Sequence, residues 1–274
     1  MLIRCGYDLL FDVPAPVVVA TRLRVLPSLK PCLREPDTIQ TDPAVPIGEW
    51  LDEFGNHAAR FLAPAGALHL FSRSLIEVSG DPDPIPVDAP QHAVEDLPAE
   101  TLQFLLASRY CEVDLLSALA WDLFGNTALG WPRVQAVCNW VHSKVLFGYP
   151  FARPTKTALD TLTERTGVCR DLQHLAIAFC RGLNIPARYA TGYLGDIGIP
   201  YDPNPMDFSA WFEVYLGGRW WTCDARHNHP RIGRILIATG RDAVDVAMTT
   251  SFGPVVLKQF TVITDEVRGA AAAP

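Results

Sequence analysis

The sequence lacks the signals that place a chain in a membrane or on a nucleic acid. No apolar run approaches the ~18–20 residues of a membrane-spanning helix. The first residues have no apolar stretch typical of a signal peptide. Lys and Arg form no cluster, and the formal net charge is −7. We therefore expect a cytoplasmic protein with no nucleic-acid partner and no membrane partner.

Cofactor and metal signals are also missing. The seven cysteines include no CxxC pair, and their odd number in a long chain favours reduced thiols. The glycines of segment 192–198 lack the following helix that a phosphate-binding loop requires. Cys223, His227 and His229 could hold a metal, but their spacing matches known zinc patterns poorly. We expect no cofactor and no metal.

The composition is that of a globular protein with a sizeable core, since 49% of the 274 residues are hydrophobic and 19% are charged. We predict a β-rich N-terminal domain over 1–80 and a linker over 81–95. A second domain over 96–268 and a disordered tail over 269–274 follow. The linker is rich in Pro, which blocks regular backbone bonding, and in Asp, which should keep it solvated.

Periodicity predicts strands first, then helices, then strands again, which indicates an α+β fold. The early strands are 17–26, 58–63 and 68–78. The helices are 97–106, 115–124, 131–145, 158–165 with Thr157 as its N-cap, and a helix from Cys169 to about Leu183. The late strands are 187–193, 209–216, 219–223, 232–238 and 255–264.

Cys169 is the first candidate for chemistry, because it stands at the first turn of an amphipathic helix, two residues after Gly167. The unpaired N–H groups and the dipole at a helix start favour a thiolate, the form that attacks a carbonyl carbon. The alternative is that Cys169 is one more small core residue, as free cysteines often are.

The two strands 209–216 and 219–223 flank a Gly-Gly turn and should form a hairpin. Counting outward from the turn pairs Trp211 with Asp224, so Ser209 and Asp224 become diagonal neighbours on one face. A helix-start cysteine facing two polar residues on adjacent strands is the arrangement of a nucleophile, a base and an orienting carboxylate.

Three motifs together resemble the bacterial transglutaminase-like superfamily, whose core is a papain-type cysteine fold. They are Gly-Val-Cys-Arg-Asp at 167–171, Ala-Trp-Phe-Glu-Val-Tyr-Leu at 210–216 and Trp-Trp-Thr-Cys-Asp-Ala at 220–225. The first 80 residues resemble the β-rich N-terminal region of a bacterial branch of that family. The resemblance implies a helical layer on an antiparallel sheet, with Cys169 as the nucleophile and Asp224 as the orienting carboxylate.

Ser209 departs from the family pattern, which has a histidine directly before Ala-Trp. A serine cannot take a thiol proton near pH 7. His227 is a possible replacement base, although a regular strand would point it away from Asp224 and only a turn would bring it back. His229 is a weaker candidate. His174 lies off the Cys169 face of its helix, and we interpret it as a packing or hydrogen-bonding residue.

Two functions follow from this pattern. In the first, Cys169 attacks a peptide or protein amide and forms a thioester, which water or an amine resolves, as in a cysteine protease, amidase or acyltransferase. The backbone N–H of Cys169 would help hold the oxyanion. In the second, the chain is an inactive relative that binds a peptide or protein partner through the inherited cleft. The sequence leaves the substrate and the oligomeric state open.

Overall fold

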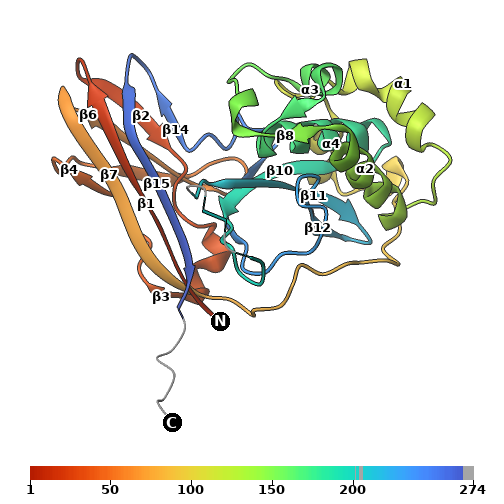
Figure 1. The fold of residues 1–274 in the computed structure, drawn as a ribbon, viewed down its shortest axis with the longest axis horizontal. Helices are drawn as coiled ribbons and strands as arrows, with labels where there is room; N and C mark the ends of the chain where they lie inside the picture. Colours follow the sequence, from red (N-terminus) through yellow and green to blue (C-terminus); the bar gives the residue numbers. More distant parts are fainter. Residues whose placement is uncertain (201, 204–205, 268–274) are drawn as a thin grey trace, which may run out of the picture.

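The computed structural model describes residues 1–200, 202–203 and 206–267. The predicted tail at 269–274 lies outside the described residues. The described chain forms two parts, a β-rich part and a part in which helices cover an antiparallel sheet (Figure 1). The α+β fold predicted from the sequence is confirmed.

Two antiparallel sheets make up the β-rich part. One has the order β15-β1-β7-β3, with β4 also paired to β7, and the other the order β14-β2-β6-β5. Their strands are β1 (Leu2–Val13), β2 (Val17–Thr21), β3 (Leu33–Glu35), β4 (Gln40–Asp42), β5 (Gly48–Leu51), β6 (His57–Ala63), β7 (Gly66–Glu77), β14 (Thr249–Ser251) and β15 (Val256–Glu266). A 3-10 helix, η1 (Pro27–Cys32), leads into β3.

Strands from opposite ends of the chain share these sheets. β15 pairs with β1 along most of its length, and β14 pairs with β2. The first 80 residues therefore bury their apolar faces together with strands that come after the helix-covered part in the sequence. β1 is not among the strands predicted above, although its residues alternate between buried and more exposed from Ile3 to Val13, with Gly6 as the one exception. The division of the chain at residue 80 stays a prediction.

The second part has a sheet of order β12-β11-β10-β13 with helices on it. Its elements are η2 (Val94–Asp96), η3 (Ala99–Leu105), α1 (Val113–Phe124), α2 (Trp131–Lys144), β8 (Leu146–Phe147), η4 (Tyr149–Phe151), α3 (Ala158–Glu164), β9 (Thr166–Gly167), α4 (Cys169–Gly182), β10 (Ala187–Tyr193), β11 (Ser209–Leu216), β12 (Arg219–Cys223) and β13 (Ile235–Gly240). The predicted elements over this part all have a counterpart within a few residues.

One of them differs in type. The stretch predicted as an α-helix over 97–106 is the 3-10 helix η3, because the backbone N–H and the hydroxyl of Thr101 both donate to the Pro98 carbonyl. Thr157 caps α3 as predicted, with a reciprocal bond between its backbone N–H and the Asp160 carboxylate. No helix in the described part of the chain is long and apolar enough to cross a membrane.

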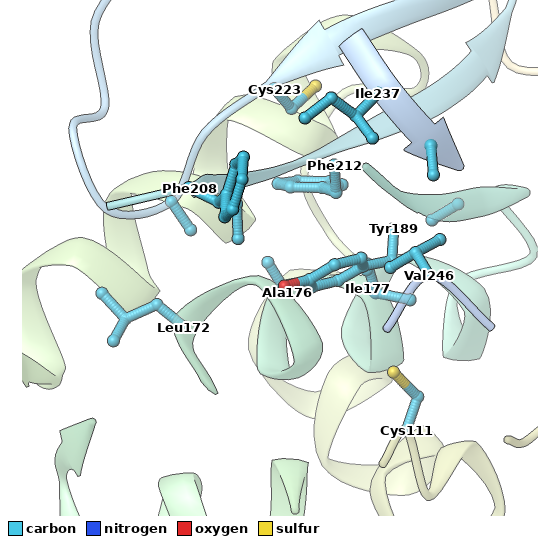
Figure 2. Close-up of a cluster of buried hydrophobic side chains, with 14 of the residues drawn as sticks. Cys111, Leu172, Ala176, Ile177, Tyr189, Phe208, Phe212, Cys223, Ile237 and Val246 are labelled. Atoms are coloured by element: carbon cyan, nitrogen blue, oxygen red, sulfur yellow. The ribbon is translucent and has the colours of Figure 1, made fainter. Parts of the chain in front are cut away.

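Helix α4 is the centre of the core. It contacts α1, α2 and α3 on one side and β10 and β11 on the other, and every residue from Asp171 to Gly182 is buried. Figure 2 shows Ala176 and Ile177 of this helix packed toward Tyr189 and Phe212 of the sheet. The position of Cys169 at its first residue is therefore fixed by the packing of a buried helix between other helices and the sheet.

The linker is bound at Asp83 to the segment before β13 instead of being solvated there. Asp83 donates its backbone N–H to the Arg231 carbonyl, and its carboxylate accepts from the Arg231 backbone N–H and from Arg234 Nε at 2.9 and 2.8 Å. The prediction that acidic residues keep the linker solvated is wrong for Asp83, because the Arg234 guanidinium needs a partner in its buried position.

Candidate active site

The start of α4 is held by its own third residue. The Asp171 carboxylate accepts the backbone N–H of Val168 at 3.0 Å and binds the Arg170 guanidinium at 2.8 Å. A Cβ on Gly167 would lie 2.8 Å from the Asp171 Cβ, so glycine is required for this turn. These contacts fix the backbone on both sides of Cys169.

Cys169 is only partly exposed, and its thiol is not ionised at neutral pH. Burial raises the pKa of Cys169 to about 11 and the nearby Asp207 also raises it, while the Arg226 guanidinium and hydrogen bonding from the backbone N–H groups of Ala210 and Arg170 lower it. The helix start alone therefore does not produce a thiolate here. Nucleophilic attack by this sulfur requires a base to remove its proton.

Asp224 follows β12 and has five hydrogen-bond donors. Its Oδ1 accepts from Gln173 Nε2 at 3.0 Å and from the backbone N–H groups of Arg226 and His227 at 2.9 and 3.1 Å. Its Oδ2 accepts from Arg234 Nη2 and binds His227 Nδ1, both at 2.8 Å. Burial would raise the pKa of Asp224, but Arg234 and His227 outweigh it and hold that pKa well below its usual range.

A tight turn returns His227 to the Asp224 carboxylate. Residues 225–227 form the turn, the Asn228 N–H donates to the Asp224 carbonyl at 2.9 Å, and Asn228 has φ of 55°. The turn that the sequence left open as a possibility is therefore present. Burial lowers the pKa of His227 more than Asp224 raises it, so the ring is neutral at pH 7.

The hydrogen bond to Asp224 decides the tautomer of this neutral ring. An ionised carboxylate can only accept, so Nδ1 of His227 carries the proton and Nε2 carries the lone pair. Within the described chain Nε2 binds no other residue. The ring is thus in the protonation state that a general base needs.

Ser209 stands at the start of β11, beside Cys169. It is 6% exposed, and its hydroxyl has no hydrogen-bond partner among the described residues. Its backbone carbonyl accepts from the Thr191 hydroxyl at 3.1 Å, which ties it to β10. An unpaired buried hydroxyl is costly, so this group is suited to bind a water or a ligand.

Cys169, Ser209 and His227 line one polar pocket of about 70 Å³. Its charged side chains have both signs and are Asp196, Asp202, Asp207, Arg226 and Arg231. No hydrogen bond in the described part of the chain joins the Cys169 sulfur to the His227 ring. The pocket is large enough for a water molecule between them.

The other candidates lie elsewhere. His229 donates its Nδ1–H to the His227 carbonyl and lines a different cavity, behind Asp224. His174 is fully buried, accepts the Ala243 N–H at 3.2 Å and stacks on Tyr110, as expected of a packing residue. The described residues include no group of three metal-type ligands, and the Cys223 thiol donates to the Trp221 carbonyl.

Sequence reasoning missed three residues that build the Asp224 cluster. Gln173 lies four residues after Cys169 on α4, a spacing that could have indicated a shared face. It also accepts the Ala225 N–H at 3.0 Å. Arg234 and Asp83 come from distant loops, and no local pattern marks them.

The fold and the site together define the class. A cysteine at the first residue of a buried helix that packs on an antiparallel sheet, with a carboxylate at the end of the adjacent hairpin, is the arrangement of papain-type α+β proteins. The histidine bound to that carboxylate differs from this arrangement, because it lies in the turn after the hairpin and Ser209 stands on the first strand.

Comparisons with known proteins then give the family. A model described as the transglutaminase-like superfamily matches residues 122–225. The crystal structure of a candidate cysteine protease from Cytophaga hutchinsonii is 30% identical with a TM-score of 0.87, over 98% of this chain and 92% of that one. An uncharacterised protein of Mycobacterium leprae is 27% identical over 221 residues, 76% of this chain and 77% of its own length. The chain belongs to the transglutaminase-like superfamily.

Proposed function

We propose that this protein is a thiol-dependent hydrolase or acyltransferase that acts on a peptide or protein amide. Cys169 is the nucleophile, His227 the base and Asp224 the carboxylate that orients it. The observation that carries the proposal is the His227 ring, which donates its Nδ1–H to Asp224 and lines the pocket that also holds Cys169, with no partner for Nε2 among the described residues. His227 would then do the work that a histidine at position 209 does in the family.

The first step is a proton transfer from Cys169 to Nε2 of His227. We propose that one water carries the proton across the polar pocket and that the Ser209 hydroxyl holds this water. Two features support the relay. The Ser209 hydroxyl lacks a protein partner, and the pocket is polar and large enough for a water. A general base can act through one water.

The acyl steps follow from this proton. The Cys169 sulfur bonds to the amide carbon, and the carbonyl electron pair moves onto oxygen. The unpaired N–H groups at the start of α4, that of Cys169 included, are the donors we expect for this oxyanion. The protonated His227 gives its proton to the leaving nitrogen as the C–N bond breaks. Water or an amine then attacks the thioester carbon while His227 takes up its proton. The C–S bond breaks, and that proton passes to the Cys169 sulfur, which restores the neutral ring.

A second function is favoured by one specific observation. The Cys169 pKa is raised to about 11, and no direct hydrogen bond within the described chain joins its sulfur to a base. Those are properties of a site whose cysteine is not activated for nucleophilic attack. In that case the protein binds a peptide or protein partner through the same cleft and does no chemistry.

Labelling of Cys169 by iodoacetamide, followed by mass spectrometry from pH 5.5 to 9, separates the two functions. We expect labelling below pH 7 in the wild type, its loss in His227→Ala, and its retention in His229→Ala. His229→Ala is the matched control, because that ring lies two residues away and does not line the pocket. If Cys169 reacts as an ordinary thiol in the wild type and only Ser209→His makes it reactive, the enzyme proposal is wrong.

A further inference from the structure

Cys169 borders a second hollow besides the polar pocket. This groove has a volume of about 800 Å³, within the range of small-molecule binding sites. Tyr149, Cys169, Asp207 and Phe208 line both hollows, so the two meet at the sulfur. A molecule that presents a carbonyl to Cys169 can therefore extend into the polar pocket on one side and into the groove on the other.

The walls of the groove are mainly apolar and come from both parts of the protein. Tyr189 and Ala210 belong to the sheet under α4, and Val244 belongs to the segment after β13. Phe260 of β15 lines the groove from the β-rich part. It packs edge-on against Phe208, with 5.9 Å between the two ring centroids. The β-rich part thus forms one wall of this hollow.

Only two charged side chains line the groove, Arg170 and Asp207. Arg170 is already paired with Asp171 at 2.8 Å, and its Nη2 also donates to the Arg153 carbonyl. Asp207 lies near the sulfur end and also lines the polar pocket. The rest of the groove offers no charge to a ligand. Two of its apolar side chains are open to solvent, since Val244 is 51% and Phe260 39% exposed.

The position of the base gives the groove a direction. The group that accepts the thiol proton later donates it to the leaving nitrogen, so that nitrogen must lie on the His227 side. His227 lines the polar pocket and does not line the groove. The acyl half of the substrate must then bind on the other side of Cys169, in the groove. This step rests on the function proposed above.

We propose that the groove binds a large apolar or aromatic side chain on the acyl side of the amide, and that Val244 and Phe260 select for it. An acidic side chain is rejected, because the groove supplies no free cation to replace its lost hydration. The leaving amine occupies the charged pocket. The substrate class is therefore a peptide amide with an apolar residue before the bond that breaks.

Chloromethyl ketones test this without a leaving amine. The Cys169 sulfur bonds to their methylene carbon, chloride leaves, and the side chain takes the acyl position. We would compare the N-benzyloxycarbonyl derivatives of phenylalanine and aspartate in alkylation rate at Cys169, each divided by the iodoacetamide rate of the same protein. The phenylalanyl ketone should react roughly 10- to 100-fold faster, the range expected for burial of one large apolar side chain.

Variants locate the selection. Val244→Lys should reduce the ratio to about threefold or less, since it removes apolar surface and supplies a cation at the groove. Phe260→Ala should lower the ratio through loss of apolar contact alone. Val256→Lys is the matched control, because Val256 lies on the same strand as Phe260, is 47% exposed and does not line the groove. It should keep the wild-type ratio.

Two results would overturn the inference. One is an equal rate for the two ketones in the wild type, and the other is a ratio that Val244→Lys and Phe260→Ala leave unchanged. Failure of the proposed function is a separate result, seen as slow iodoacetamide labelling below pH 7 that His227→Ala does not alter. Because the ratio is also measurable at pH 9, where more of the thiol is ionised, groove selectivity can be found with or without an activated sulfur.

Discussion

The two halves of the candidate site differ in how completely their polar groups are paired. On one side, the Asp224 carboxylate has five donors and is tied to α4 by Gln173 and to the linker by Arg234. On the other side, the Cys169 thiol has a raised pKa and the Ser209 hydroxyl has no partner within the described chain. His227 joins the two halves, because its Nδ1 binds the Asp224 carboxylate and its side chain lines the pocket shared by Cys169 and Ser209.

This difference indicates that the Asp224 half of the site stabilises the fold, and that the Cys169 half is available to bind a ligand. Paired buried charges are costly to break, so the Asp224 side should behave as part of the core. Unpaired buried polar groups cost free energy in the folded protein, and that cost is recovered when a ligand or a water binds to them. A change on the first side should therefore appear in stability, and a change on the second side in reactivity.

The largest effect should come from Asp224→Ala. It leaves the Arg234 guanidinium, itself buried, with only Asp83, and it removes the acceptor of Gln173 and His227. We expect a loss of about 3–5 kcal/mol in the free energy of unfolding, as for other broken buried pairs. Urea unfolding measures it. Arg4→Ala is a control on a half-exposed ion pair and should cost about 1 kcal/mol or less. Equal losses in the two variants would mean that the Asp224 cluster is not a structural unit.

His227→Gln tests the residue that joins the halves. A glutamine can still donate to Asp224, so we expect the stability to change by less than about 1 kcal/mol. It cannot accept the thiol proton, so labelling of Cys169 at pH 7 should fall roughly 100-fold, within the range for loss of a general base. Stopped-flow labelling and urea unfolding on the same preparation give both values. A loss of stability without a loss of reactivity would assign His227 to the structural side.

Acid should weaken the fold through His174 before it affects Asp224. Burial, with help from Arg170 and Arg181, holds the pKa of His174 well below 6.5, so the unfolded chain binds a proton that the folded one does not. Stability is then complete above about pH 6.5 and falls on acidification by roughly 1.4 kcal/mol per pH unit. The pKa of Asp224 is lowered from 3.8, so its contribution is lost only below that pH.

The measurement is urea unfolding between pH 7 and 5. His174→Gln should reduce the slope while it keeps an acceptor for the Ala243 N–H, and it should leave the part contributed by His57 and His227, whose pKa values burial also lowers. His142→Gln, at an exposed histidine on α2, should leave the slope as in the wild type. An unchanged slope in His174→Gln would place the acid-sensitive group elsewhere.

The same comparison explains what the sequence could predict. The Cys169 helix and the Gly-Gly hairpin are local patterns, and both are present as predicted, with Leu216 paired to Arg219 across the turn. Each of these elements buries one face in the core, so its apolar residues recur with the period of a helix or a strand. That period can be recognised in the sequence alone. The predicted Trp211–Asp224 pair would extend this register by one residue beyond Cys223, where β12 ends.

What the sequence could not predict depends on contacts between distant segments. The return of His227 requires the chain to leave β12 in a tight turn, and the Asp224 donors hold that turn. Arg234 reaches Asp224 across ten positions of the segment between β12 and β13, and Asp83 reaches Arg234 across 151 positions. The pairing of β15 with β1 joins the two ends of the chain. None of these contacts produces a residue period or a motif spacing that could be recognised in the sequence.

The smallest change in stability, and the sharpest distinction between the halves, should come from Ser209→Ala. Its hydroxyl is buried without a protein partner, so removal should leave the free energy of unfolding unchanged or raise it by up to about 1 kcal/mol. If that hydroxyl holds the relay water, the same variant should slow Cys169 labelling at pH 7 by about tenfold, the factor that a loss of roughly 1.4 kcal/mol gives. Thr101→Val is the control, since the Thr101 hydroxyl is buried, donates to the Pro98 carbonyl, and Thr101 lines neither of the two hollows at Cys169. A drop in stability with unchanged labelling would show that position 209 belongs to the packed side, and that His227 takes the thiol proton without its help.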